Sequence, residues 1–97
     1  MTWIQDYIKE RSERDHEFRV AYEEEAALLA LIRARNNAEL SQKDVADALH
    51  VSQPYIAQVE RGSKPMSLSL MVRYANVVGA TIEVKTKKRP KKQKAAA

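Results

Sequence analysis

The chain has 97 residues, 44% of them hydrophobic, a length that suits one small helical domain with tails and leaves no room for a second, enzyme-sized domain. It contains no cysteine, which excludes disulfides and thiolate zinc sites, and five carboxylates among its first twenty residues argue against a secretory signal. No apolar run reaches membrane-spanning length, so we expect a soluble, cytoplasmic protein.

The formal net charge of +4 is unevenly distributed. Residues 1–36 carry six Lys/Arg against eight Asp/Glu, residues 37–84 carry four against five, and residues 85–97 carry seven against none. A nucleic-acid binder is expected to have a basic patch. The mildly acidic body fits that class only if its basic groups cluster, as Lys43, Arg61 and Lys64 could do.

The first predicted helix follows Thr2, a suitable N-cap. Its apolar side chains fall at helical spacing and form one aromatic-rich side: Trp3, Ile4, Tyr7 and Ile8. So short a helix is unstable alone in water and must dock onto something. Two uses remain open: the helix folds back on its own domain or a dimer mate, or its aromatics anchor a different protein.

A long second helix is predicted from about His16 to Asn36, with Asp15 as its cap and the charged stretch 11–14 as a hinge before it. Its apolar stripe repeats at three- and four-residue steps: Phe18, Tyr22, Ala26, Leu29 and Ile32. The acidic block Glu23 to Glu25 is either a solvated helix face or a surface that complements a basic partner.

Residues 41–62, SQKDVADALHVSQPYIAQVERG, predict two short helices folded about a tight corner, the outline of a helix-turn-helix. Ser41 and Asp44 form an acidic variant of the capping box, and the first helix should end near His50. Ser52 caps the second helix, and Gly62 stops it. Its outer face carries hydrogen-bonding side chains suited to base edges and phosphates: Gln53, Tyr55, Gln58 and Arg61.

A final helix is predicted from Ser67 to Gly79, with a core face of Leu68, Met71, Ala75 and Val78. Its other apolar positions, Leu70, Tyr74 and Val77, suit either a dimer contact or burial against the long helix. Residues 80–85 alternate as a half-buried strand that would pair with a symmetry mate or another protein. Residues 86–97 are predicted to be a disordered basic tail, which either only solubilises the chain or contacts phosphates.

The central motif resembles the Cro and phage-repressor type of helix-turn-helix, over roughly Leu28 to Gly79. The matching residues are Gln42, Ser52, Gln53, Gln58 and Glu60, with Arg35 ahead of them. The resemblance implies that Gln42 fastens to DNA backbone and to its neighbouring glutamine, and that the recognition-helix glutamines reach bases. It also implies a structural ion pair between Arg35 and Glu60. Two positions that usually hold glycine in that family hold His50 and Glu39 here, where a left-handed backbone costs on the order of 1 kcal/mol.

The flanking segment DHEFRVAYEE, from Asp15 to Glu24, is similar to antitoxins of the HigA kind in type II toxin–antitoxin modules. Their partners are basic ribonuclease toxins of the RelE and HigB group. This resemblance implies a dimer that binds operator DNA through the helix-turn-helix and holds the toxin through its N-terminal region.

Catalysis and metal binding are not expected, because His16 and His50 are far apart and no serine or thiol has a plausible base beside it. The rival functions are a free-standing repressor of the same fold and a protein-interaction module that has lost DNA binding.

The sequence therefore predicts an all-α, lambda-repressor-like fold in four parts: a helical arm (1–14), a helix-turn-helix domain with a long leading helix (15–79), a strand (80–85) and the tail (86–97). We expect an antitoxin that represses its own operon, without cofactor or metal. The DNA-binding candidates are Gln42, Lys43, Ser52, Gln53, Tyr55, Gln58, Arg61 and Lys64. The toxin-binding candidates are Trp3, Ile4, Tyr7, Ile8, Phe18 and Tyr22.

Overall fold

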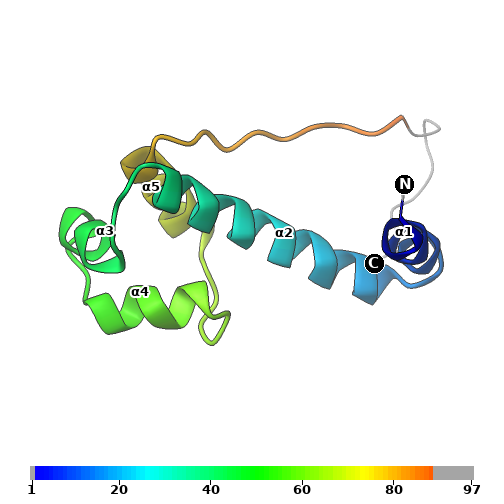
Figure 1. The fold of residues 1–97 in the computed structure, drawn as a ribbon, viewed down its shortest axis with the longest axis horizontal. Helices are drawn as coiled ribbons and strands as arrows, with labels where there is room; N and C mark the ends of the chain where they lie inside the picture. Colours follow the sequence, from blue (N-terminus) through cyan, green and yellow to red (C-terminus); the bar gives the residue numbers. More distant parts are fainter. Residues whose placement is uncertain (1, 89–97) are drawn as a thin grey trace.

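The computed structural model describes residues 2–88, which form five α-helices and confirm the all-α prediction. These are α1 (Trp3–Arg14), α2 (His16–Asn37), α3 (Gln42–Leu49), α4 (Gln53–Glu60) and α5 (Leu68–Val78). The C-terminal part of α2 joins α3, α4 and α5 in one body, whereas the rest of α2 projects from it and carries α1 at its far end (Figure 1). The Cα radius of gyration is 16.0 Å, above the ~13 Å of a compact domain of this size, so the projecting helices dominate the shape.

The hydrophobic core lies between the end of α2 and the three helices that follow. Its buried side chains are Leu31, Val45, Ala46, Ile56, Val59, Leu70, Tyr74, Ala75 and Val78. Only one of them, Leu31, belongs to α2. The core is therefore built almost wholly from the helix-turn-helix and α5.

None of the five side chains of the stripe predicted along α2 is fully buried, and Phe18 is half-buried. Tyr22 and Leu29 are 46% and 43% exposed, and Ile32 is half-buried. A helix of 22 residues is ~33 Å long, whereas α5, the 11-residue helix of the body that packs against it, is ~17 Å long. The body is thus too short to cover the first half of α2.

The junction between α1 and α2 is a single residue, Asp15. Its backbone N–H donates to the Arg11 carbonyl and closes α1, while its carboxylate accepts from the Phe18 N–H and opens α2. The predicted hinge over residues 11–14 is therefore wrong, because that stretch is the last turn of α1. Arginine and glutamate favour helix, and the extended backbone of Asp15 makes the break.

Helix α5 is turned differently from the prediction. Leu70 and Tyr74 are buried together with Ala75 and Val78. Of the two alternatives for Leu70 and Tyr74, a dimer contact or burial, the structure therefore supports burial. Leu68, predicted for the core, is 71% exposed, because it lies in the first turn, where nothing in the described chain covers it. The exposed side of α5 presents Leu68 and Val72.

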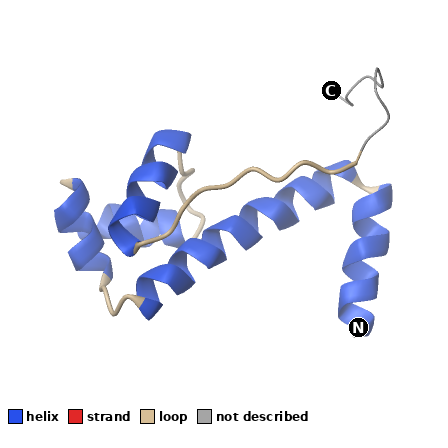
Figure 2. Ribbon diagram, turned by 90° about the horizontal axis from the view of Figure 1, so that it is seen from above, coloured by secondary structure: helices blue, strands red, loops and turns tan. Residues whose placement is uncertain are grey.

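The predicted strand at residues 80–85 is absent from the structure of residues 2–88. The segment from residue 80 to 88 instead runs extended beside α2 toward α1 (Figures 1 and 2). A strand is defined by hydrogen bonds to a neighbouring strand, and the described chain offers none. Ile82 and Val84 are 36% and 89% exposed. Most of the predicted basic tail, residues 89–97, lies outside the described residues.

Candidate nucleic-acid interface

Local hydrogen bonds fix the start of each helix of the helix-turn-helix, α3 and α4. The Ser41 hydroxyl accepts from the Asp44 N–H at 3.0 Å, and the Asp44 carboxylate accepts from the Ser41 N–H at 2.8 Å, so the predicted capping box is present. Ser52 accepts from the Tyr55 N–H and caps α4. His50 ends α3 in the left-handed conformation, with φ of 58°. The short connection therefore sets α4 against α3 without a glycine.

A hydrogen-bonded network centred on Glu60 ties this corner to the rest of the body. Arg35 donates to both carboxylate oxygens, from Nε at 2.9 Å and from Nη2 at 2.8 Å. The Tyr74 hydroxyl donates to Oε2 at 2.6 Å, and the Gln42 amide donates to Oε1 at 3.1 Å. Arg35 also donates to the Leu40 carbonyl at 2.9 Å. One carboxylate thus joins α2, α3, α4 and α5.

Hydrogen bonds and burial fix the protonation states of the three titratable groups in this network. Burial alone disfavours the ionised form of Glu60, but hydrogen bonds from Arg35, Tyr74 and Gln42 together lower its pKa below the ordinary value. The same carboxylate raises the pKa of Arg35 through its hydrogen bond. Burial, with the adjacent carboxylate, raises the pKa of Tyr74 far above the ordinary tyrosine value. The pair is therefore ionised, and the phenol neutral, throughout the physiological range.

The network extends to the surface through two glutamines. The Gln53 amide nitrogen donates to the Gln42 side-chain oxygen at 2.8 Å. Gln42 is half-buried, whereas Gln53 is exposed at the first position of α4. Because an amide has further donors and acceptors, Gln53 remains able to bond to a base edge while Gln42 sets its orientation.

A shallow depression surrounds these glutamines on the outer face of the corner. It is lined by Arg35, Ser41, Gln42, Lys43, Asp47, Val51, Ser52 and Gln53, four of which are DNA-binding candidates. The Lys43 ammonium pairs with Asp47 at 2.8 Å, which raises the pKa of Lys43, but both side chains are more than half exposed, so this pair is weak and can open. The Ser52 hydroxyl is already engaged as the cap of α4.

The other four DNA-binding candidates lie farther along α4 and in the loop after it. Tyr55 is half-buried against the core, and the Lys64 ammonium stands 5.9 Å from the centre of its ring. Gln58 is half-buried, and its carbonyl accepts from the Ser63 N–H. Arg61 is exposed and caps α4. The candidates thus extend from α3 along the whole of α4 and into the loop after it.

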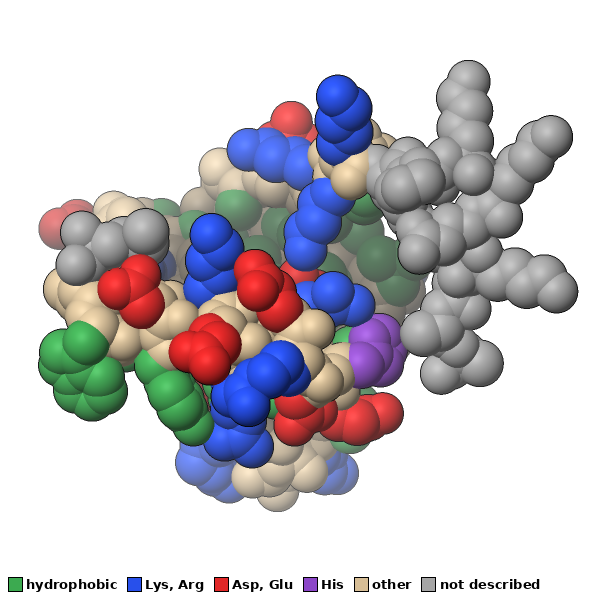
Figure 3. Space-filling view, turned by 90° about the vertical axis from the view of Figure 1, so that its right-hand side faces the viewer, with side chains coloured by type: hydrophobic (Ala, Val, Ile, Leu, Met, Phe, Trp, Pro, Cys, Tyr) green, Lys and Arg blue, Asp and Glu red, His purple; other side chains and the backbone are tan. Residues whose placement is uncertain are grey.

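The predicted toxin-binding side chains lie at the opposite end of the molecule. Helix α1 buries none of its residues, and Trp3, Ile4 and Tyr7 are 76%, 50% and 48% exposed. Phe18 stacks on Tyr22 with ring centres 6.4 Å apart, and the Arg11 guanidinium lies 4.7 Å from the Phe18 ring. Figure 3, which faces this end, shows acidic and basic side chains interspersed, with hydrophobic ones reaching the surface at one edge.

Two features of the site have no clear signal in the sequence. Tyr74 supplies the shortest bond to Glu60, yet its spacing suited a dimer face equally well. The carbonyl of Leu40, which fixes Arg35, is a backbone group that no pattern marks.

Comparison with known proteins gives one finding. A protein-family model described as helix-turn-helix matches residues 31–84, which is more than half of the chain and includes the whole network. No curated protein and no solved structure matches the chain. Within residues 2–88, no helix is long and apolar enough to cross a membrane, and no group of three or more His, Asp or Glu side chains is placed to hold a metal ion.

Proposed function

We propose that this chain, which belongs to the helix-turn-helix family of DNA-binding transcription regulators, is the antitoxin of a type II toxin–antitoxin module. In this proposal it binds a RelE- or HigB-like ribonuclease toxin and represses its own operon. The parts are those expected from the sequence: an arm (1–14), a DNA-binding domain (15–79) and a basic tail (86–97).

The observation that carries the proposal is the exposed aromatic surface on α1. Trp3 is 76% exposed, and an amphipathic helix that leaves such a side chain in water has its apolar side free for a partner. The first half of α2 also exposes Tyr22 and the acidic block Glu23 to Glu25. Aromatic anchors beside carboxylates suit a small basic protein, the charge type of the proposed toxin.

On the DNA side, we propose a homodimer that places two copies of α4 in successive major grooves, about one helical turn apart. Gln53 and Gln58 read bases, while Gln42, Lys43, Ser52, Tyr55, Arg61 and Lys64 contact the backbone or support the readers. The exposed side of α5, with Leu68 and Val72, supplies the dimer contact. Leu70 and Tyr74 take no part in that contact, because they are buried in the core.

The second candidate is a free-standing repressor without a toxin. That reading uses Trp3 and Tyr7 inside the molecule, whereas both side chains are about half exposed or more in the described chain. The exposure therefore argues against burial of these side chains within the same chain and leaves them available to a partner.

The test is co-expression with the product of the adjacent reading frame, if that frame encodes a small basic protein. We expect the two proteins to co-purify, growth arrest by the second protein to be relieved, and the complex to retard its own promoter fragment in a gel shift. A chain that binds the promoter and neither binds nor neutralises the adjacent product is a free-standing repressor.

A further inference from the structure

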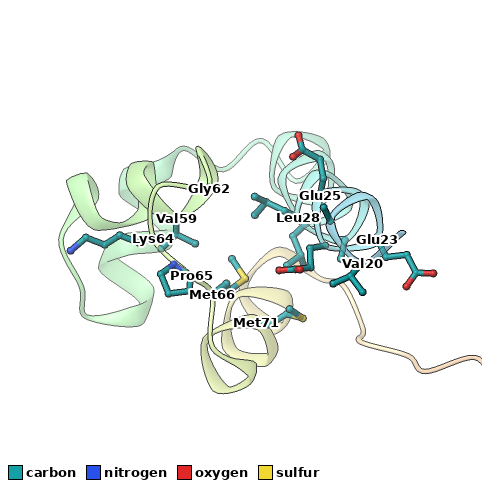
Figure 4. Close-up of a pocket in the computed structure, with 14 residues that line it drawn as sticks. Val20, Glu23, Glu25, Leu28, Val59, Gly62, Lys64, Pro65, Met66 and Met71 are labelled. Carbon is teal, nitrogen blue, oxygen red and sulfur yellow. The ribbon is translucent and has the colours of Figure 1, made fainter. Parts of the chain in front are cut away.

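A groove lies between the middle of α2 and the loop that joins α4 to α5. Its volume is about 570 Å³. Figure 4 shows one wall formed by side chains of α2 and the other by residues around Gly62 and Met66, with Met71 of α5 between them. None of the DNA-binding candidates except Lys64 reaches it. It is thus a surface separate from the corner of α3 and α4.

The two sides of the groove differ in chemistry. Its floor is apolar and includes Leu28, Leu31, Met66 and Met71. Methionine side chains adapt to irregular partners, which suits a surface that accepts an inserted side chain. Glu23, Glu24 and Glu25 belong to the α2 edge, where Figure 4 shows Glu25 at the top and the Glu23 carboxylate directed away from the groove. The groove thus has an apolar floor with acidic residues along one edge.

One carboxylate of the acidic block, that of Glu23, is paired within the chain. The Lys87 ammonium, on the segment that runs back along α2, lies 3.6 Å from the Glu23 carboxylate. Both side chains are more than half exposed, at 77% and 59%, so this pair is weak. A lysine or arginine of a partner can therefore replace Lys87 beside Glu23. An ammonium group can therefore approach this acidic block, and the apolar floor of the groove beside it is open in the described chain.

We propose that this groove is a second docking site for the basic partner, which inserts an apolar side chain onto the methionine floor and places lysine or arginine against Glu24 and Glu25. The assignment rests on the proposed antitoxin function and extends its interface from the arm to the DNA-binding domain. The occupant is a segment rich in both lysine or arginine and apolar residues, because only such a segment complements both the floor and the acidic edge.

Two exposed alanines on α2 provide a matched test. Ala27 lines the groove, whereas Ala30, three residues on, does not. Ala27→Arg fills the groove and sets a cation against the partner's cations, while Ala30→Arg adds the same charge to the same helix outside it. Both positions are exposed, so both variants are expected to fold, which a thermal melt checks. The double variant Glu24→Gln/Glu25→Gln removes two negative charges from the groove. Its control is Glu39→Gln/Glu83→Gln, which removes the same charge from positions outside the groove.

The probe is the purified product of the adjacent reading frame, titrated against each full-length variant by calorimetry at low and physiological salt. We expect Ala27→Arg and Glu24→Gln/Glu25→Gln to weaken binding at least tenfold, and the two control variants to change it less than twofold. The Glu24/Glu25 variant should also show the weaker dependence on salt.

Other outcomes have separate meanings. Equal binding by all four variants, with wild-type affinity, overturns the groove assignment and leaves the antitoxin function standing. Dissociation of a homodimer by Ala27→Arg in analytical ultracentrifugation, with partner binding unchanged, makes the groove a self-contact and also overturns it. A wild-type chain that does not bind the adjacent product overturns the proposed function and the groove assignment together.

Discussion

The hydroxyl of Tyr74 donates a 2.6 Å hydrogen bond to Oε2 of Glu60, and this contact links the hydrophobic core to the polar surface of the corner. Tyr74 is fully buried on α5, and Glu60 is the last residue of α4. Through Gln42 and then Gln53, the same carboxylate reaches the exposed start of α4. The orientation of the proposed base-reading amide is thus set by a residue in the core.

Loss of the Tyr74 hydroxyl should therefore destabilise the fold. Tyr74→Phe keeps the ring and removes one hydrogen bond to a charged acceptor, a change that costs about 2 kcal/mol. The measurement is the free energy of unfolding from urea denaturation followed by circular dichroism. Tyr55→Phe is the control, because it removes a hydroxyl from a half-buried ring outside the Glu60 network. Equal stability of the two variants would show that the bond to Glu60 contributes little.

The depressed pKa of Glu60 predicts loss of stability in acid. The carboxylate is ionised more readily in the folded than in the unfolded chain, so the unfolded chain binds more protons near the ordinary pKa of 4.5. Its contribution is full above that value and is lost as the pH falls through the lower folded pKa. Glu60→Gln should be less stable than wild type near neutral pH, and the gap should shrink on acidification. The measurement is urea denaturation at a series of pH values from about 7 down to about 3. A gap that stays constant over this series would contradict the assignment.

The left-handed backbone at His50 predicts a stabilising substitution. His50 has φ of 58° and ψ of 40°, a conformation in which glycine has no Cβ penalty. His50→Gly should therefore stabilise the protein by about 1 kcal/mol. Ala26→Gly, at an exposed position in the interior of α2, is the opposite case and should destabilise by about 0.5–1 kcal/mol. Thermal denaturation distinguishes the two, and a His50→Gly protein that melts below wild type would refute the argument.

Loss of the Gln53 amide should relax sequence preference. Gln53→Ala removes an exposed amide held by Gln42 and should weaken binding to the promoter by about 1–3 kcal/mol, with little change on random DNA. Lys64→Ala is the contrast, because loss of a phosphate contact weakens both and lowers the salt slope by about 1. Titrations on both DNAs at several salt concentrations provide the measurement. If Gln53→Ala weakens both DNAs equally, Gln53 is not a base-reading residue.

Removal of residues 1–24 should separate the two proposed activities. The buried core begins at Leu31, so the truncated chain keeps every core side chain and the whole Glu60 network. It should remain a folded, DNA-binding dimer, and it should fail to neutralise the toxin because the exposed aromatic arm is gone. Circular dichroism, gel shift and co-purification measure these properties. A truncated protein that still forms the toxin complex would rule out the arm as the main anchor.

Much of the fold was predictable because helix ends depend on near neighbours. Thr2, Asp15, Ser41, Ser52 and Ser67 each cap a helix through an N–H three residues away, so the sequence alone locates each start. Glu39 and His50 have left-handed backbones, and they stand at the two positions where the resembling family usually has glycine. The helix-turn-helix and its glutamines follow from such short-range signals.

The faces of the helices were not predictable in this way, because burial depends on where distant helices lie. Only the packed structure puts Tyr74 in the core and Leu68 in water. The first half of α2 stays largely exposed because α5, which packs against α2, is only half as long. The groove beside Met66 lies between α2 and the loop that joins α4 to α5, two segments that are far apart in the chain. The sequence by itself determined the helices and the corner, since these depend on bonds between near neighbours. The tertiary structure decided which surfaces remain free for partners, since that depends on contacts between segments far apart in the chain.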